Sequence, residues 1–298
     1  MTVSKLMINK LTLKSYAKVN LYLEVLSKRK DGYHDISTIF ERIGLADKVT
    51  LKNRKDGLTV IFCSDPAVPK DFSNLCWKAA ESLRRRSGLK KGLDIRIEKR
   101  IPVGAGLGGG SSNAAAVLTG LNRLWKLKIP EEKLARLGGG IGSDVPFFIY
   151  NTPFAEGRER GNVIRPLNKL KGLRFWHILV VPKIHVSTPL IYKKWDDFCG
   201  LTTPVLGVKL LIPAISKKGF RPQRSTFFNG LEVVTERLYP EVRRIKEKLL
   251  SLGVSPVLMS GSGPAVFGIV PSRKEAVSLS RKLNKHNNSW RVFIVKTV

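Results

Sequence analysis

The stretch that most restricts how this chain can fold is Pro102–Ala116, which reads PVGAGLGGGSSNAAA. Five glycines fall within the seven residues Gly104–Gly110. Glycine reaches backbone conformations closed to other residues, and it lets the backbone approach a ligand without a Cβ in the way. Apolar residues then recur at helical spacing from Ala114 to Trp125. The sequence therefore predicts a glycine loop that opens into a helix from about Ser112 to Trp125.

A loop of this kind, joined to a helix, is suited to hold an oxyanion. The first amides of a helix have no intrahelical partner, and they carry a partial positive charge. Ser111 and Ser112 are candidate caps that can also donate their hydroxyls. The junction therefore predicts a polyphosphate site. It is neither a Walker loop, since G-x-x-x-x-G-K-[ST] is absent, nor a Rossmann fingerprint, since the preceding chain is not βαβ.

The chain has 298 residues, a length for which two domains are the usual expectation. The stretch Asn151–Leu173 is rich in Pro, Gly, Asn and charge, so we expect the domain junction there, with domains at residues 1–160 and 161–298. Strand and helix patterns are mixed along the chain, which predicts the α+β class.

Hydrophobic periodicity and turn residues locate the other elements. We expect strands within Leu11–Leu26, Thr50–Phe62, Leu93–Ile97, Phe147–Tyr150, Phe175–Val181, Val257–Met259, Ala265–Val270 and Arg291–Val295. We expect further helices at Leu75–Leu83, from Pro130 to the glycines at 138–140, at Pro240–Leu252, and from Ser272 onward.

Charge and cysteine usage limit the class of protein. Lys and Arg outnumber Asp and Glu by 53 to 23, a formal charge of +30, which attracts anions in general; dispersed as it is, the charge is also typical of a solvated surface. No signal peptide or membrane span is evident. Cys63, Cys76 and Cys199 are odd in number and far apart, and the four histidines lack zinc-site spacing. We therefore expect a cytoplasmic protein with no disulfide framework, no protein-bound metal centre and no membrane partner.

Transfer of a phosphoryl group needs a base or orienting group for the acceptor and a cation for the developing charge. Asp144, in the segment Ile141-Gly-Ser-Asp-Val-Pro146, is the candidate base, although an Asp that only caps a turn is an equal alternative. Lys18, in Ala17-Lys-Val-Asn20, is the candidate cation, and the alternative is a solvated charge on an edge strand.

Taken together, three segments resemble the GHMP kinase superfamily. They are the Lys18 strand, the Pro102–Ala116 loop and Leu258-Met-Ser-Gly-Ser-Gly-Pro-Ala265, and they occur in the family's order. The combination of AKVNLYLE, KDGYH, GLGGGSSNAA and GSDVPFF narrows the resemblance to family members whose acceptor is a polyol carrying a cytidine diphosphate group. The resemblance implies an N-terminal domain of the ribosomal protein S5 domain 2-like type and a C-terminal GHMP-type α+β domain.

The resemblance also implies roles for individual residues. Asp144 would take the proton of the acceptor hydroxyl, and Lys18 would stabilise the developing charge. ATP, accompanied by Mg²⁺, would bind Asn74, Lys99, Pro102, Val103, Gly104, Ala105, Gly106, Leu107, Gly108, Gly109, Gly110, Ser111, Ser112 and Asn113. The acceptor would bind Asn20, Tyr33, His34, Thr188, Tyr192, Gly261, Ser262 and Gly263, with Tyr192 stacked on the cytosine and His34 reading its edge. A monomer or weak homodimer is expected, with no specific nucleic acid partner.

Two other functions stay open at this point. One is a GHMP kinase with another acceptor, which the segment Asp31-Gly-Tyr-His34 and Tyr192 disfavour. The other is a basic RNA-binding protein without catalysis, which the charge favours and the presence of Lys18, Asp144 and the glycine loop disfavours.

Overall fold

The computed structural model describes residues 9–197, 207–217, 220 and 222–298, which group into two compact units. The first unit contains the described residues up to Tyr16, together with Ala46–Val103 and Gly109–Asn151. The second contains Ala17–Leu45, Gly104–Gly108 and the described part of Thr152–Val298. Strands β1 (Lys10–Lys28) and β2 (His34–Arg54) contribute residues to both units. Each unit mixes helices with strands, which confirms the α+β class, whereas the domain division at residue 160 stays a prediction.

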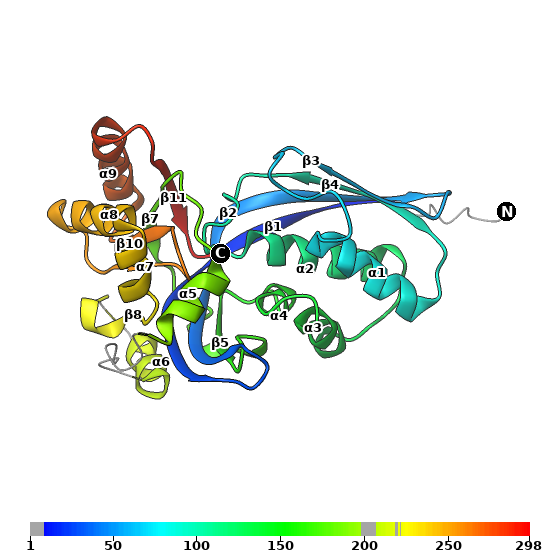
Figure 1. Cartoon of the computed structure of the whole chain (residues 1–298), viewed down its shortest axis with the longest axis horizontal. Helices are drawn as coiled ribbons and strands as arrows, with labels where there is room; N and C mark the ends of the chain where they lie inside the picture. Colours follow the sequence, from blue (N-terminus) through cyan, green and yellow to red (C-terminus); the bar gives the residue numbers. More distant parts are fainter. Residues whose placement is uncertain (1–8, 198–206, 218–219, 221) are drawn as a thin grey trace. The chain divides into compact units, whose positions relative to one another are not determined.

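The first unit places two helices against strands (Figure 1). Strand β4 pairs antiparallel with the end of β2, Lys48–Arg54, and parallel with β3. Helices α1 and α2 pack on each other and share one apolar core with these strands. Besides the ends of β1 and β2, its elements are β3 (Thr59–Cys63), α1 (Leu75–Ser87), β4 (Gly92–Glu98), α2 (Gly109–Leu124), α3 (Glu131–Gly139) and α4 (Val145–Ile149).

The second unit contains a four-stranded antiparallel sheet in the order β11-β7-β10-β9. Separately, β2 pairs with β5, β5 pairs with β6, and β1 pairs with β8. The strands are β5 (Phe154–Arg158), β6 (Val163–Pro166), β7 (Trp176–Val181), β8 (Phe228–Asn229), β9 (Val257–Met259), β10 (Val266–Val270) and β11 (Arg291–Lys296). The helices are α5 (Thr188–Trp195), α6 (Val208–Ser216), α7 (Glu232–Leu238), α8 (Pro240–Ser251) and α9 (Arg273–His286), with 3₁₀ turns at Asn168–Leu170 and Arg224–Thr226.

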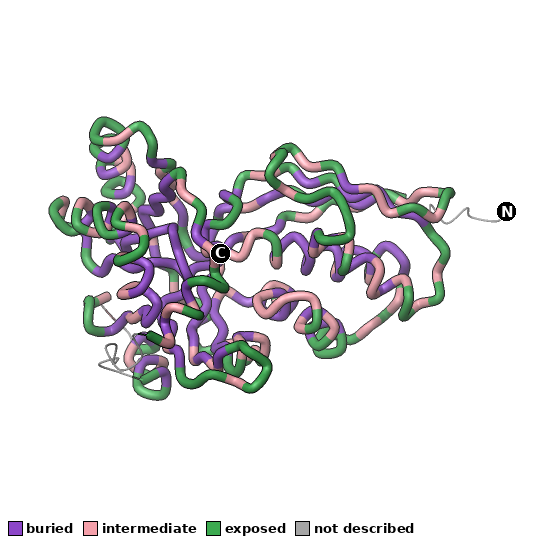
Figure 2. The backbone as a smooth tube through the Cα atoms, in the orientation of Figure 1, coloured by how far each residue is buried: buried purple, intermediate pink, exposed green. Residues whose placement is uncertain are grey.

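The core of the second unit lies between its sheet and helices α7, α8 and α9. Every residue of β9 and β10 is buried, as is β7 from His177 onward (Figure 2). Strands buried on both faces need continuous apolar runs, which these short strands have.

Most predicted elements with strong periodicity or clear boundaries are confirmed. They include the strands near Phe175, Val257, Ala265 and Arg291 and the helices that begin at Leu75, Glu131, Pro240 and Arg273. Ser272 caps the last of these helices by accepting a hydrogen bond from the Glu275 amide.

Two local predictions are wrong. The segment Phe147–Tyr150 lies in helix α4 and at its C-cap instead of in a strand, because Pro146 sits in its first turn, where proline favours a helix. Helix α2 begins at Gly109, so Ser111 and Ser112 lie inside its first turn and do not cap it. Close packing of Gly109 on Ile101 outweighs the low helix propensity of glycine there.

The proline- and glycine-rich stretch after Asn151 contains the hairpin β5–β6, which extends the pairing of β2. Cys63 and Cys76 are free thiols, while Cys199 lies outside the described residues. Within the described ranges, every helix is too short or too polar to cross a membrane.

Candidate active site

Lys18 is buried, with only 4% of its surface exposed, so the alternative of a solvated edge charge is wrong. Its Nζ donates a hydrogen bond to Asn20 Oδ1 at 2.7 Å and lies 5.5 Å from the centre of the Phe40 ring. A buried ammonium group is stable only when polar or π partners replace its lost water. Strand β1 therefore holds a cation in a fixed position.

Asn20 is itself held in place by the neighbouring strand. Its Nδ2 donates to Thr38 Oγ1 at 2.8 Å, and the Thr38 hydroxyl donates to the Tyr22 carbonyl at 2.6 Å. The side-chain amide of an Asn has two hydrogens on Nδ2, so the second hydrogen is not used by Thr38. Asn20 can therefore orient Lys18 and still offer one donor to a bound acceptor.

All three motif segments meet within the second unit. The Lys18 amide donates to the Leu107 carbonyl at 3.0 Å, which joins β1 to the glycine loop. The Ser260 hydroxyl donates to the Gly106 carbonyl at 3.0 Å, and the Ala265 amide donates to the Ala105 carbonyl at 3.3 Å. Segments far apart in the sequence thus form one polar cluster around the loop.

Glycine is required where these segments approach each other most closely. At Gly106 the φ angle is +74°, and a Cβ would lie 2.2 Å from the Ser260 carbonyl oxygen. At Gly261 a Cβ would lie 3.3 Å from Lys18 Nζ. The third motif therefore passes directly beside the buried lysine, and side chains at these positions would separate the segments.

The loop Ser260–Gly263 is held by side chains around it. Asn229 Nδ2 donates to the carbonyls of Met259 and Gly261, each at 2.8 Å. The Ser262 and Thr188 hydroxyls are 2.7 Å apart, so the structure brings together two residues predicted for the acceptor side. Gly263 closes the turn by donating its amide to the Ser260 carbonyl at 2.9 Å.

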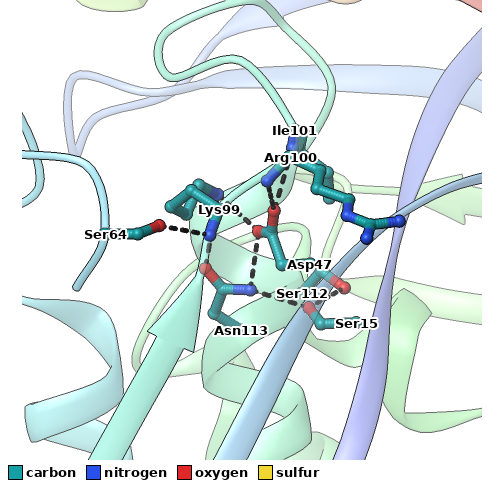
Figure 3. Close-up of polar contacts among 8 residues, drawn as sticks. All are labelled: Ser15, Asp47, Ser64, Lys99, Arg100, Ile101, Ser112 and Asn113. Carbon is teal, nitrogen blue, oxygen red and sulfur yellow. Dashed lines mark hydrogen bonds and ion pairs between the residues drawn. The ribbon is translucent and has the colours of Figure 1, made fainter. Parts of the chain in front are cut away.

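In the first unit, a single carboxylate organises the residues predicted for the ATP side (Figure 3). Asp47 Oδ1 accepts hydrogen bonds from the amides of Arg100 and Ile101 at 2.7 and 2.9 Å. Its Oδ2 pairs with Lys99 Nζ and accepts from Asn113 Nδ2 at 2.9 Å. The Asp47 side chain is fully buried, and that of Lys99 is 6% exposed.

Ser15 extends this network to the first turn of α2. Its hydroxyl accepts from Asn113 Nδ2 at 2.8 Å and donates to Ser112 Oγ at 2.7 Å (Figure 3). Asn74 lies apart from it as the N-cap of α1, where it accepts from the Cys76 amide at 2.8 Å and donates to the Pro69 carbonyl at 2.6 Å. Two of the predicted ATP residues, Lys99 and Asn113, are therefore in contact, and Asn74 has a structural role.

The rest of the glycine loop differs in exposure along its length. Ala105 and Leu107 point into the core, whereas Val103 is exposed. Pro102 is buried directly before the loop. Gly106 and Gly108, which follow Ala105 and Leu107, are partly exposed, so the buried side chains hold a loop whose glycines are partly accessible.

Asp144 is the N-cap residue of helix α4, with φ −82° and ψ −11°. Its carboxylate makes no capping hydrogen bond to that helix. The Asp144 side chain therefore does not cap helix α4, and its role as the base stays a prediction. Asp144 lies in the first unit and Lys18 in the second, and their joint action stays a prediction.

The residues predicted for the cytosine gather in the second unit. The rings of His34 and Tyr192 are 5.3 Å apart at 31°, and Trp195 meets His34 edge-on at 5.8 Å. Tyr33 is 53% exposed, and the Arg160 guanidinium lies 4.8 Å from its ring centre. His34 Nε2 lies 2.8 Å from Asp196 Oδ1, and Lys28 Nζ lies 2.5 Å from Asp196 Oδ2.

Asp196 is held in its charged form by these neighbours. The hydrogen bond from His34, followed by that from Lys28, keeps the pKa of the Asp196 carboxyl below its ordinary value, and partial desolvation opposes them. The cluster therefore combines flat rings with one fixed carboxylate.

Asp47, Thr38 and Asp196 were not identified from the sequence. For Asp47 a signal exists, because Leu45, Asp47, Val49 and Leu51 alternate along β2 and all are buried. An acid at a core-facing position of a strand needs buried partners and so indicates a polar network. Asp196 follows a short helix and carries no comparable pattern.

Comparison with known proteins places the chain in a family. Residues 74–152 match the GHMP kinases N terminal domain, and residues 211–289 match the GHMP kinases C terminal domain. The chain belongs to the GHMP kinases, and it is a small-molecule kinase.

The particular relatives are 4-diphosphocytidyl-2-C-methyl-D-erythritol kinases. The one from Shouchella clausii is 44% identical over 88% of this chain and 86% of its own length. The one from Bacillus velezensis is 45% identical over 86% of this chain and 87% of its own. A crystal structure of 4-(cytidine 5'-diphospho)-2C-methyl-D-erythritol kinase matches with a TM-score of 0.76 and 32% identity, covering 96% of this chain and 98% of that one.

Membership of the GHMP kinases bears on whether the basic chain is an RNA-binding protein without catalysis. An RNA-binding protein without catalysis does not fit a chain whose relatives over most of its length are named as kinases. The predicted membership of the GHMP superfamily is confirmed.

Proposed function

We propose that the protein transfers a phosphoryl group from ATP to the 2-hydroxyl of 4-diphosphocytidyl-2-C-methyl-D-erythritol. The products are the 2-phospho compound and ADP, in the non-mevalonate synthesis of isoprenoid precursors. The observation that carries this proposal is the meeting of β1, the glycine loop and the Ser260–Ala265 segment around the buried Lys18. Such a cluster supplies a fixed cation and a backbone that a phosphate can approach closely.

In the proposed reaction, the acceptor oxygen attacks the γ-phosphorus of ATP while its proton passes to the Asp144 carboxylate. The bond between that phosphorus and the bridging oxygen breaks, and ADP leaves with the electron pair. Lys18 stabilises charge that develops on the transferred group. Asn20 keeps Lys18 in place and offers its remaining amide hydrogen to the polyol.

ATP is the phosphoryl donor of GHMP kinases, and the proposed contacts are those of residues 102–113 with its phosphates. Lys99 and Asn74 are proposed to lie near the adenine. Within the described residues, no three His, Cys, Asp or Glu side chains gather as a metal site. We propose that Mg²⁺ accompanies ATP, bound to the triphosphate whose charge it neutralises.

On the acceptor side, the aromatic cluster is suited to a nucleobase. Tyr192 offers a face for stacking, and His34 offers a polar edge beside it. We propose that Tyr33 forms the outer wall of the nucleobase pocket. The acceptor's phosphates are proposed to contact Thr188, Gly261, Ser262 and Gly263. We further propose a cytoplasmic monomer or weak homodimer with domains at residues 1–160 and 161–298.

The test is ADP release with the cytidine diphosphate substrate, using mevalonate and homoserine as competing acceptors. The wild-type protein should use only the first, and Asp144→Asn should lower kcat by about 10²-fold or more, since a general base typically contributes that much. Asp56→Asn is the matched control, because Asp56 is exposed and pairs with Arg54 on the surface. Unchanged turnover in Asp144→Asn would remove Asp144 from the mechanism, and preference for another acceptor would contradict the proposed substrate.

A further inference from the structure

Asp196 makes a contact that the proposed reaction does not by itself require. It is the C-cap residue of α5, and its Oδ1 lies 2.8 Å from Nε2 of His34, the first residue of β2. The His34 side chain is 3% exposed, whereas that of Asp196 is 25% exposed. One carboxylate at the rim of the aromatic cluster therefore bonds to a buried imidazole.

The position of Asp196 is unfavourable for an acid in other respects. The carbonyl end of a helix carries a partial negative charge, so a carboxylate there is repelled. The next residue, Asp197, makes an ordinary surface pair with Lys194 at 3.1 Å, and its side chain is 57% exposed. Asp196 instead faces His34, with Lys28 as its second partner. The contact with His34 and Lys28 thus outweighs the repulsion between the Asp196 carboxylate and the carbonyl end of α5.

The contact determines which nitrogen of His34 carries the hydrogen. An ionised carboxylate can only accept hydrogen bonds, so Nε2 must be the donor. In the neutral ring Nδ1 is then left with a lone pair and acts as an acceptor. The hydrogen bond that the structure gives to the His34 ring is made at Nε2, which leaves Nδ1 for a bound base. The rings of Tyr192 and Trp195 restrict how the imidazole can turn.

We propose that Asp196 is a positioning residue that sets the tautomer of His34, so that the pocket prefers a base with an exocyclic amino group to one with a carbonyl there. This inference rests on the proposed function, in which His34 lies beside the nucleobase. Cytosine presents an amino donor where uracil presents a carbonyl acceptor. A lone pair on Nδ1 accepts a hydrogen bond from the amino group of cytosine and repels the carbonyl oxygen of uracil. A site that pairs with an amino donor therefore discriminates against a base that has a carbonyl in its place.

The first measurement detects the tautomer directly. Protein labelled with ¹⁵N-histidine is examined by two-dimensional ¹H–¹⁵N NMR at about pH 8, where an unperturbed imidazole is neutral. His34 should carry its hydrogen on Nε2 in the wild type. In Asp196→Asn the amide can donate to Nε2, so the Nδ1–H form should gain population. Asp197→Asn removes the same charge one residue away and should leave the tautomer unchanged.

The second measurement is binding of CDP and of UDP, followed by titration of the same NMR signals. The wild type should bind CDP more tightly, and Asp196→Asn and Asp196→Ala should reduce the preference by about tenfold, the effect of one hydrogen bond. Asp197→Asn should keep the wild-type preference. Kinetics with the full substrate should show a raised KM in the Asp196 variants and a kcat within about twofold of wild type, since Asp196 does not touch the reacting atoms.

The outcomes separate the two proposals. If the wild type phosphorylates the cytidine substrate but the Asp196 variants keep the CDP preference, the role of Asp196 is overturned and the function stands. If the tautomer shifts without a change in preference, His34 does not read the base through Nδ1, and the inference is likewise overturned. If the wild type discriminates through Asp196 but transfers no phosphoryl group to the substrate, the proposed function fails while the inference stands.

Discussion

Lys18 and Asn20 lie on the same face of strand β1, and the lysine donates a 2.7 Å hydrogen bond to the amide oxygen of the asparagine inside the protein. Alternate residues of a strand share a face, so two side chains in the A-K-V-N segment meet without help from the rest of the chain. Thr38 of β2 then fixes the asparagine from the other side. The cation is therefore oriented by local geometry together with one neighbouring strand.

We expect Lys18→Met to lower kcat by about 10²-fold or more, because removing a preorganised cation raises the energy of the charged transition state. The variant should also lose about 1–3 kcal/mol of stability, because the buried Asn20 Oδ1 is left without its donor. Lys14→Met, at an exposed position of the same strand, is the control and should leave kcat at the wild-type level. An active Lys18→Met would show that charge stabilisation comes from another group.

Asp47→Asn should destabilise the protein by about 3–5 kcal/mol, since it leaves the buried Lys99 charge without its partner. The new amide group places a donor against the donors Lys99 Nζ and Asn113 Nδ2, which should displace both side chains, so the KM for ATP should rise more than kcat falls. Urea denaturation and steady-state kinetics measure the two effects. The surface variant Asp56→Asn should leave the unfolding free energy close to that of the wild type, because an exposed ion pair contributes little. Equal costs in the two variants would rule out Asp47 as the organiser of this region.

Gly106→Ala and Gly88→Ala form a matched pair. Both glycines have positive φ, +74° and +67°, but an added Cβ meets the Ser260 carbonyl at 2.2 Å only at Gly106 and has no neighbour within 4 Å at Gly88. Gly88→Ala should therefore cost about 1–2 kcal/mol of unfolding free energy from backbone strain alone. Gly106→Ala should cost more and should also reduce kcat/KM for ATP. Similar costs for both variants would mean that the contact between the loop and the third motif is not tight.

Because the Cys76 thiol is buried, we expect the free energy of unfolding to fall at alkaline pH. Burial raises the pKa of its thiol to about 12, from an ordinary value of about 9. A folded-state pKa above the unfolded one means that the folded protein binds more protons in this range, so stability is full below about pH 9 and declines as the pH rises toward 12.

The measurement is urea denaturation from neutral to alkaline pH in wild type and Cys76→Ala. The variant should lose less stability over this window than the wild type does. Cys63→Ala, which changes a less buried thiol, should keep the wild-type slope. Identical slopes in all three proteins would exclude Cys76 as a source of the alkaline loss.

Local signals predicted much of the fold and part of the site. Helix α8 follows from its amphipathic spacing between Pro240 and Gly253, and β10 from its apolar run. Helix α4 was not predictable in this way, because a run of five mainly apolar residues suits a buried strand as well as a buried helix. Asp196 was missed because its partner His34 lies 162 residues away in the sequence.

The sequence by itself determined that the chain has a glycine loop joined to a helix, strands and helices of the α+β class, and the ordered motifs of a GHMP kinase. These features depend on the backbone preferences of single residues and on the spacing of apolar and polar residues within about twenty positions. Both are properties of a local stretch of sequence. Only the tertiary structure decided that Lys18 is buried, that Asp47 rather than a cap holds the start of α2, and that Asp196 bonds to His34. Hydrogen bonds between distant segments depend on which faces pack together, and no local pattern specifies that pairing.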